Sequence, residues 1–220
     1  MSKALILDFG GVVTRTLFET HDLSEAALGL APGRLIWRGP FDPDNDPLWR
    51  DMQADRISER DYWMKRTREV GALVGKDWTK MADFVRAARG GDPDAVIRPE
   101  FREAVAAARA AGVRLAILSN ELDLFYGADF RDKLPFLADF DVIVDATYTN
   151  ILKPDPRAYR ACLDELGLPA GDCVFVDDQL RNIEGAQAVG LQTVHFNVRQ
   201  PRESYAAALE LLGIAEGSTP

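Results

Sequence analysis

The sequence is poor in cysteine and histidine, with two of each among 220 residues. Two cysteines cannot build the disulfide framework of a small secreted domain, so we expect Cys162 and Cys173 to be reduced core residues of a cytoplasmic protein. The chain also lacks any apolar stretch of the ~18 residues that a transmembrane helix needs. The first apolar run stops at Asp8 and no cleavage site follows it, so we predict no signal peptide.

Basic residues are fewer than acidic ones, 26 Lys and Arg against 35 Asp and Glu, which gives a formal net charge of -9. Nucleic acid and anionic lipid repel such a chain, so we expect neither a nucleic acid nor a membrane as its partner. The hydrophobic content of 47% and the charged content of 28% are typical of a globular protein and exclude intrinsic disorder.

Five short apolar runs predict the strands of a parallel sheet. They are rich in Val, Ile, Leu and Phe and mostly lack polar alternation, which is typical of strands that are buried on both faces. These runs are Ala4–Leu7, Val113–Leu118, Val142–Val144, Cys173–Val176 and Thr193–Phe196. Helical patterns with proline at the start or glycine at the end lie between and after the later runs. They cover Pro99 to Gly112 and, approximately, Pro156 to Leu166, Asn182 to Val189 and Glu203 to Leu212. This alternation predicts a doubly wound α/β core.

A long segment of helical character separates the first strand from the second. Ser58 and Asp61 resemble a capping box at the start of one helix. Asp77 is a candidate N-cap for another helix, which we expect to stop at Gly90-Gly91. The stretch Gly39–Pro47 is dense in Pro, Asp and Asn and predicts a loop. We therefore predict an α-helical domain over residues 17–97, inserted into a core of residues 1–16 and 98–220.

Polar side chains follow four of the predicted strands. Asp8 follows the first strand, Ser119-Asn120 the second, Asp145 the third and Asp177-Asp178 the fourth, and Lys153 lies in the loop after Asp145. Open α/β sheets bind ligands at this edge. Each residue alone is as readily a turn or a helix cap, but together they combine clustered carboxylates with a cation. Carboxylates that repel one another imply a divalent cation, and oxygen ligands favour Mg²⁺ over zinc.

Four runs of residues resemble the motifs of the haloacid dehalogenase (HAD) superfamily and occur in the same order. They are LILDFGGVV, LAILSN, ILKPDPRAY and VFVDDQLRNIEGAQAVG, and they span nearly the whole core. The inserted segment is placed like the helical cap of subfamily I, and it is similar to the sugar-phosphatase-like and epoxide-hydrolase N-domain-like branch. The resemblance implies a Rossmann-like core, Mg²⁺ dependence and, usually, hydrolysis of phosphate monoesters.

The resemblance also implies a metal site. Asp8, Asp178 and the backbone carbonyl of Gly10 would hold Mg²⁺. Asp177 would be a further ligand or would orient one. Asn182 stands where relatives often have another acid, which leaves its contact with the metal open.

The same resemblance assigns residues to the chemistry and to the substrate. Asp8 would be the nucleophile that forms an aspartyl-phosphate. Ser119, the amide of Asn120 and Gly11 would bind the phosphoryl group. Lys153 would neutralise the charge that builds up in the transition state.

One position departs from the family pattern. Family phosphatases usually carry a second Asp two residues after the nucleophile, which protonates the leaving group and later activates water, and here that position is Gly10. The loss of such a group typically costs ~10²–10⁴-fold in rate. One hypothesis is a phosphatase that takes the proton from water or from Glu19, His21 or Asp22.

Two other hypotheses stay open at this point. A hydrolase of carbon–halogen or phosphonate bonds is chemically coherent, since a halide leaves without a proton. However, the Asp177-Asp178 pair indicates a metal, which halide displacement does not need. A weakly active or silent binding module is the third hypothesis, and the intact set of polar residues at the strand ends argues against it.

The inserted domain should select the substrate. Its arginines are candidates to meet an anion and its aromatics to stack on a ring, although for most of them we favour solvent exposure and packing within the domain. These residues are Arg15, Arg34, Arg38, Arg50, Trp37, Trp49, Tyr62, Trp63 and Trp78. A domain that closes over the site implies a small, anionic and soluble metabolite. The sequence leaves open which metabolite this is and whether the chain forms a homodimer.

Overall fold

The computed structural model describes residues 2–89 and 93–214. The chain divides into two compact units. The first contains Met1–Arg15, Val96–Asp123 and Phe130–Pro220, and the second contains Thr16–Ala95 and Leu124–Asp129. Residues 124–129 therefore belong to the second unit, whereas from the sequence we expect them in the core. The expected helix end at Gly90-Gly91 lies outside the described residues.

The first unit is built on a five-stranded parallel sheet with the order β3-β2-β1-β4-β5. The strands are β1 (Ala4–Leu7), β2 (Arg114–Ser119), β3 (Val142–Asp145), β4 (Cys173–Asp177) and β5 (Gln192–His195). All five expected strands are confirmed, with ends that differ by one residue at most. The chain builds outward from β1 to β3 and then from β4 to β5 on the other side, so the sheet is doubly wound. Central β1 is completely buried, which explains its unbroken apolar sequence.

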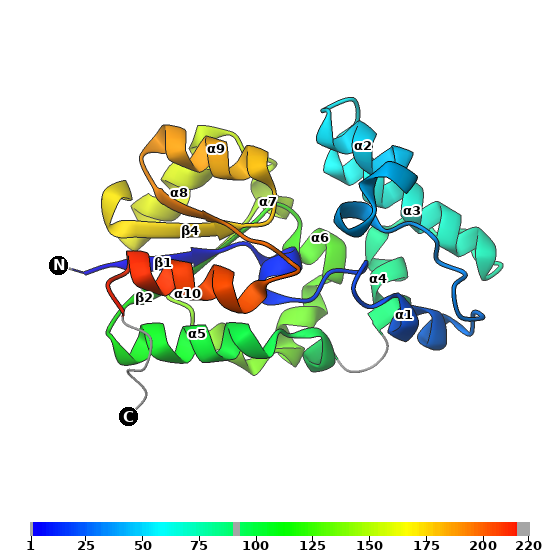
Figure 1. Cartoon of the computed structure of the whole chain (residues 1–220), viewed down its shortest axis with the longest axis horizontal. Helices are drawn as coiled ribbons and strands as arrows, with labels where there is room; N and C mark the ends of the chain where they lie inside the picture. The colour runs from blue at the N-terminus through cyan, green and yellow to red at the C-terminus, as the bar shows by residue number, and fades with distance from the viewer. Residues whose placement is uncertain (1, 90–92, 215–220) are drawn as a thin grey trace. The chain divides into compact units, whose positions relative to one another are not determined.

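Helices cover both faces of this sheet (Figure 1). Helices α8 (Pro156–Leu166) and α9 (Leu180–Val189) pack on one face, and α5 (Pro99–Ala110) and α10 (Pro201–Leu211) pack on the other. Proline opens α5, α8 and α10, where a missing N–H costs no hydrogen bond. Gly167 and Gly190 end α8 and α9 in the left-handed conformation. Two short helices, α6 (Leu122–Tyr126) and α7 (Ala146–Thr149), follow β2 and β3.

Both cysteines lie in the hydrophobic core between the sheet and helices α8 and α9, with Cys162 on α8 and Cys173 at the start of β4. Cys162 and Cys173 are free and buried among residues such as Tyr159 and Phe175. Burial raises the pKa of the Cys162 thiol to about 12 and that of the Cys173 thiol to about 11. Both thiols are therefore protonated at neutral pH and serve packing, as the sequence predicts.

The second unit is helical. Its helices are α1 (His21–Leu28), α2 (Pro47–Gln53), α3 (Glu59–Leu73) and α4 (Met81–Arg89). The capping box is confirmed, because Ser58 and Asp61 exchange both hydrogen bonds at the start of α3. Asp77 is not an N-cap, since α4 begins only at Met81 and residues 76–79 have no regular structure. No helix in the described part of the chain is both long enough and apolar enough to cross a bilayer.

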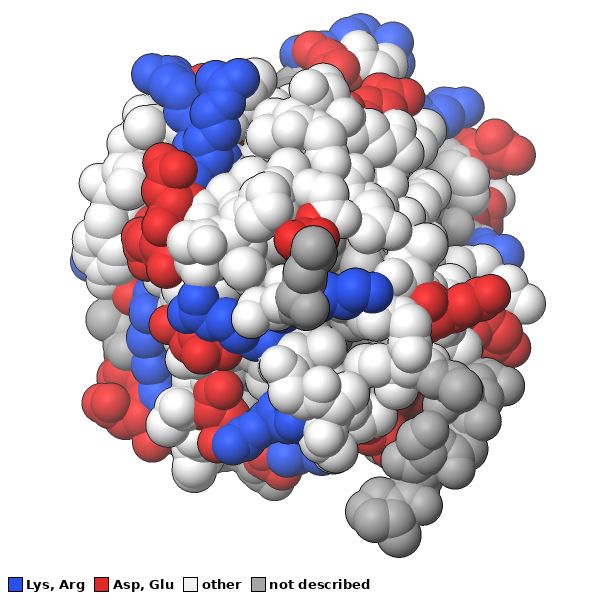
Figure 2. Space-filling view, turned by 90° about the vertical axis from the view of Figure 1, so that its left-hand side faces the viewer, with Lys and Arg blue, Asp and Glu red and all other residues white. Residues whose placement is uncertain are grey.

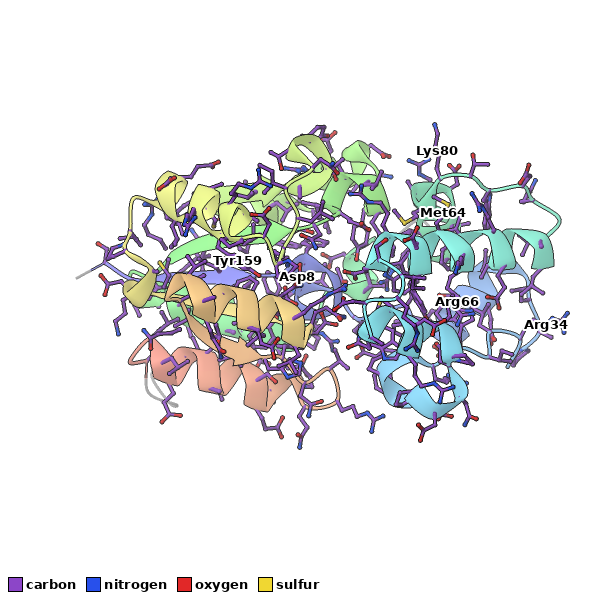
Figure 3. All side chains as sticks on the ribbon, turned by 90° about the horizontal axis from the view of Figure 1, so that it is seen from above. Asp8, Arg34, Met64, Arg66, Lys80 and Tyr159 are labelled. Atoms are coloured by element: carbon purple, nitrogen blue, oxygen red, sulfur yellow. The ribbon has the colours of Figure 1, made fainter. Side chains whose placement is uncertain are left out.

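A buried carboxylate organises the core of the second unit. Asp46 accepts hydrogen bonds from Arg66 at 2.6 Å and from the Tyr62 hydroxyl at 3.1 Å. The Arg66 side chain lies within the second unit (Figure 3) and stacks over the rings of Trp37 and Tyr62. Trp37, Trp49 and Tyr62 are buried, so packing within the domain is the role that the structure gives these three aromatics.

Residues 124–129 join the second unit through side-chain contacts. The ring of Phe125 packs against that of Trp63 with centroids 5.3 Å apart, and Arg86 pairs with Asp129 at 3.1 Å. No periodic pattern in the sequence indicates such a long-range contact.

On the face of the molecule shown in Figure 2, acidic and basic side chains are interspersed among uncharged ones. The net charge of -9 therefore does not produce a single-sign patch on this face.

Candidate active site

The strand register places two carboxylates side by side at the edge of the sheet. Leu7 of β1 pairs with Val176 of β4, so the following residues, Asp8 and Asp177, are neighbours at the ends of the two strands. The Asp8 backbone N–H donates to the Val176 carbonyl at 2.9 Å, so the hydrogen bonding between β1 and β4 continues as far as Asp8. The prediction that the polar strand ends meet at one edge is thus confirmed for this pair.

Lys153 bridges these two carboxylates. Its Nζ donates to Asp8 Oδ1 at 2.8 Å and to Asp177 Oδ2 at 2.6 Å, and its side chain is 1% exposed. Burial alone would lower the pKa of Lys153, but the charges of Asp177 and Asp8 and the hydrogen bonds to them raise it above its ordinary value. The lysine is therefore a permanent cation that fixes the orientation of Asp8.

Asp177 already uses its full capacity for hydrogen bonds. Besides Lys153, its oxygens accept from the Gln179 backbone N–H at 2.8 Å and from the Asn182 amide at 3.1 Å on each oxygen. A carboxylate offers about four lone-pair sites, and three donor atoms make four contacts with them, since Asn182 Nδ2 lies 3.1 Å from both oxygens. Of the two roles expected for Asp177, this arrangement favours orienting a neighbour over binding a metal ion.

The donors around Asp177 are themselves held in place. The Tyr159 hydroxyl donates to the Asn182 backbone carbonyl at 2.7 Å, which ties α8 to the start of α9. Asp8 and Tyr159 both lie in the first unit (Figure 3). Asn182 Oδ1 is buried and has no hydrogen-bond partner among the described residues. A buried acceptor is normally satisfied by water or an ion when the protein supplies no donor.

A third carboxylate completes the cluster. One carboxylate oxygen from each of Asp8, Asp177 and Asp178 lies within 4.8 Å of the other two. His195 Nε2 donates to the backbone carbonyl of Asp178 at 3.1 Å and holds this residue at the end of β4. Three carboxylates and one lysine leave an excess of negative charge. The all-oxygen donor set and the unpartnered Asn182 acceptor both fit a hydrated hard cation such as Mg²⁺.

The two residues that follow Leu118 have different surroundings. Ser119 ends β2 and is buried, and its hydroxyl oxygen accepts from the Glu121 N–H at 3.4 Å. The Asn120 side chain instead binds the backbone of Lys153 with both of its polar atoms. From the sequence we expect the Asn120 amide to bind the phosphoryl group, and in the structure its side chain is hydrogen-bonded to the main chain of another loop.

The turn after Asp8 contains two glycines with different backbone angles. Gly10 has φ -72° and ψ 123°, which any residue can adopt, whereas Gly11 has φ 84°, which favours glycine. The Gly11 carbonyl accepts from buried Arg98 at 3.0 Å, and the Val12 carbonyl accepts from the Tyr205 hydroxyl at 2.9 Å. No local signal in the sequence indicates these two anchors, because they come from distant segments.

Asp145 stands apart from the carboxylate cluster. Its oxygens accept from the backbone N–H groups of Thr147 and Asp123, and Arg131 pairs with it at 2.9 Å. It thus caps α7 and binds β3 to the segment after β2. The expectation that Asp145 joins the ligand edge with the other carboxylates is replaced by this structural role.

The three candidate proton donors lie in the second unit. Glu19 accepts from the backbone N–H and the hydroxyl of Thr16, and Asp22 is exposed. His21 is buried next to Trp37, and burial and the Arg38 charge lower its pKa to about 4. Arg38 Nη1 lies 3.2 Å from His21 Nδ1, and since a guanidinium only donates, this nitrogen is the acceptor of a neutral imidazole.

Several known proteins are similar to this chain. A family model described as haloacid dehalogenase-like hydrolase matches residues 2–190. Protein CbbY of Cupriavidus necator is 37% identical over 208 residues, which are 87% of this chain and 77% of that protein. Phosphatase MT3486 of Mycobacterium tuberculosis is 28% identical over 172 residues, which are 77% of this chain and 75% of that protein.

A dehalogenase shares the fold. The L-2-haloacid dehalogenase of Xanthobacter autotrophicus superposes with a TM-score of 0.59 at 20% identity, covering 98% of this chain and 85% of that one.

Acyl-CoA dehydrogenase family member 10 of Mus musculus is 34% identical over 116 residues, which are 52% of this chain. The chain spans only 10% of that longer relative.

Proposed function

Because this chain belongs to the haloacid dehalogenase-like hydrolase family, we propose that it hydrolyses phosphate monoesters of small anionic metabolites through an aspartyl-phosphate on Asp8. The observation that carries the proposal is the junction of Asp8 with buried Lys153 beside two further carboxylates. Attack by a carboxylate on a phosphate dianion needs positive charge close by, because the two anions repel each other. Lys153 supplies such a charge next to Asp8. The relationship to a mycobacterial phosphatase supports the same reaction class.

In the first half of the reaction, an Asp8 oxygen forms a bond to phosphorus while the ester P–O bond breaks. Lys153 holds the attacking carboxylate and compensates the charge on the phosphoryl oxygens. The Ser119 hydroxyl, which already accepts from the Glu121 N–H, would donate a hydrogen bond to a phosphoryl oxygen. In the second half, the oxygen of a water molecule forms a bond to phosphorus while the bond between Asp8 and phosphorus breaks. Inorganic phosphate leaves, the proton of the attacking water passes to solvent, and the Asp8 carboxylate is restored.

Asp8, Asp178 and the Gly10 carbonyl would hold a Mg²⁺ ion, and Asp177 would orient Lys153. When bound, the ion would supply the positive charge that lets a carboxylate approach a phosphate dianion. The hydrogen bonds that Asp177 accepts on both of its oxygens support an orienting role for Asp177 and a metal-binding role for Asp178.

Proton supply to the leaving group differs from the usual family arrangement, because Gly10 has no side chain. We propose that water donates this proton. The neutral His21, which already accepts from Arg38, is a poor source of it. Esters whose alcohol is a good leaving group should therefore react best.

A carbon–halogen hydrolase is the second candidate, and Gly10 is the observation that favours it. The same Asp8 would attack carbon and expel a halide, which needs no proton. This chemistry has no use for the clustered carboxylates next to Asp8, so we rank it below phosphate ester hydrolysis.

The experiment is a screen of the purified protein against a panel of phosphorylated metabolites, p-nitrophenyl phosphate and a 2-haloacid, with Mg²⁺ and with EDTA. The proposal predicts release of phosphate that requires Mg²⁺. Halide release that persists in EDTA, without phosphatase activity, would replace it by the second candidate.

A further inference from the structure

The side chain of Asn120 closes on a single residue of another loop. Its Oδ1 accepts from the Lys153 backbone N–H at 2.7 Å, and its Nδ2 donates to the Lys153 carbonyl at 3.1 Å. One amide thus satisfies both main-chain polar groups of a residue 33 positions away. The donor and acceptor pattern also fixes which end of the amide faces which group.

This contact joins the end of β2 to the loop that carries the lysine. Lys153 lies in the irregular segment between α7 and α8, where no strand or helix ladder holds the main chain. Its ammonium nevertheless has to meet Asp8 and Asp177 at 2.8 and 2.6 Å, in a site where its side chain is 1% exposed. The two hydrogen bonds between the Asn120 side chain and the Lys153 backbone, which we call the Asn120 clamp, anchor the main chain of Lys153.

We infer that Asn120 is a positioning residue, which acts on the reaction through Lys153 and not by binding the substrate with its side chain. The inference rests on the proposed function, because it concerns the lysine that would stabilise the phosphoryl group. Both polar atoms of the amide contact the Lys153 backbone, through Oδ1 and one N–H of Nδ2. The second N–H of Nδ2 is the one donor that the clamp does not use, and binding of phosphate through it would change Ki for phosphate. A displacement of about 1 Å at a reacting group can cost ~10²-fold in rate.

The test compares kcat and KM for p-nitrophenyl phosphate, and Ki for inorganic phosphate, in the wild-type protein and in Asn120→Ala. We expect kcat to fall by ~10–10²-fold, with KM and Ki changed by less than about threefold. If the amide binds the phosphoryl group instead, Ki for phosphate rises at least as much as kcat falls. That result would overturn the inference.

Asn197→Ala is the matched control. Asn197 also holds an exposed loop after a strand of the same sheet, since its Oδ1 accepts from the Arg199 N–H and its Nδ2 donates to Gln200. The substitution also removes two hydrogen bonds of an asparagine side chain, but these bonds join residues two and three positions away and do not reach Lys153. We expect kcat to stay within about threefold of wild type. An equal loss in both variants would reduce the role of Asn120 to general stability and would overturn the inference.

A double substitution distinguishes an effect of Asn120 through Lys153 from an effect that is independent of Lys153. In a Lys153→Gln background, Asn120→Ala should add less than about threefold to the loss in kcat, because the group that it positions is gone. Additive losses would contradict an action through Lys153. Asn120→Asp, which keeps the acceptor and loses the donor, is the second variant and should also lower kcat with an unchanged Ki. Thermal melting verifies that each variant is folded.

The failure of the inference and that of the proposed function give different results. If wild type releases no phosphate, or if Lys153→Gln retains full activity, the proposed function fails and the inference falls with it. If Lys153→Gln is inactive while Asn120→Ala is fully active, the proposed function stands and only the inference is overturned.

Discussion

Lys153 donates to the Asp8 carboxylate at 2.8 Å across 145 residues of sequence. The same ammonium lies 2.6 Å from Asp177, whose side chain is completely buried. The ammonium of Lys153, which both carboxylates share, neutralises one of the negative charges of the cluster and fixes the orientation of the Asp8 carboxylate. The proposed nucleophile, Asp8, is therefore oriented before any substrate binds, which would reduce the reorganisation that the proposed reaction requires.

Asp8→Asn should abolish turnover and leave folding nearly unchanged. The amide cannot attack phosphorus, while Lys153 keeps Asp177 as its partner. Steady-state kinetics and thermal melting measure the two effects. Mass spectrometry must accompany them, because slow hydrolysis of the introduced amide would restore the aspartate. Activity within tenfold of wild type in a verified variant would remove Asp8 from the mechanism.

The paired aspartates should respond differently to substitution. We expect Asp178→Asn to raise the Mg²⁺ concentration for half-maximal activity by at least about tenfold, since it removes a proposed ligand. Asp177→Asn should lower kcat and leave that concentration within about threefold, because its oxygens serve Lys153, Gln179 and Asn182. Magnesium titrations of both variants decide this. The opposite pattern would make Asp177 the metal ligand.

Gly10→Asp should restore the missing acid. The backbone angles of Gly10, φ -72° and ψ 123°, are open to any residue, so the side chain should be tolerated. We expect turnover of alkyl phosphates to rise more than that of p-nitrophenyl phosphate, whose leaving group needs little protonation. Relative rates on the two ester classes measure the effect, and a wild-type protein that hydrolyses both equally fast would show that another group already supplies the proton.

Gly11→Ala is the control for backbone strain in the same turn. Gly11 has φ 84°, a left-handed conformation that alanine adopts at a cost of about 1 kcal/mol or more. We expect a lower melting temperature for Gly11→Ala and an unchanged one for Gly10→Asp. Equal destabilisation would mean that the turn accepts a side chain at neither position.

Acid should destabilise the second unit through His21. Burial and the charges of Arg38 and Arg66 hold the pKa of His21 at about 4, although Glu25 and Asp22 act in the opposite direction. Well above the ordinary histidine pKa of about 6.5, the folded and unfolded states both carry neutral histidine, so there is no effect. As the pH falls from there to about 4, only the unfolded state takes up the proton, and the free energy of unfolding drops by about 2–3 kcal/mol.

The measurement is thermal unfolding from about pH 7.5 to about pH 5, with His21→Gln as the variant that cannot titrate. Wild type should lose more stability than the variant over this range, and the His21 ring protons should titrate near pH 4 in NMR spectra. Parallel stability curves for the two proteins would contradict the account.

The strands and most of the polar strand ends were predictable because they depend on local patterns. A buried parallel strand needs a continuous apolar run, and the residue that follows it, such as Asp8, must lie at the ligand edge. The clamp of Asn120 on Lys153 was not predictable, because it depends on where a distant loop crosses the end of β2. The role of Asp145 likewise depends on Arg131, and the contact of Phe125 with Trp63 on packing between distant segments.

The most direct test of an aspartyl-phosphate is acid quenching during turnover, followed by mass spectrometry of the peptide that contains Asp8. With a phosphate ester and Mg²⁺, the account predicts a peptide heavier by one phosphoryl group, with the modification on Asp8 and absent from Asp8→Asn. Rapid release of phosphate by an enzyme whose quenched Asp8 peptide stays unmodified at every time point would contradict the central claim.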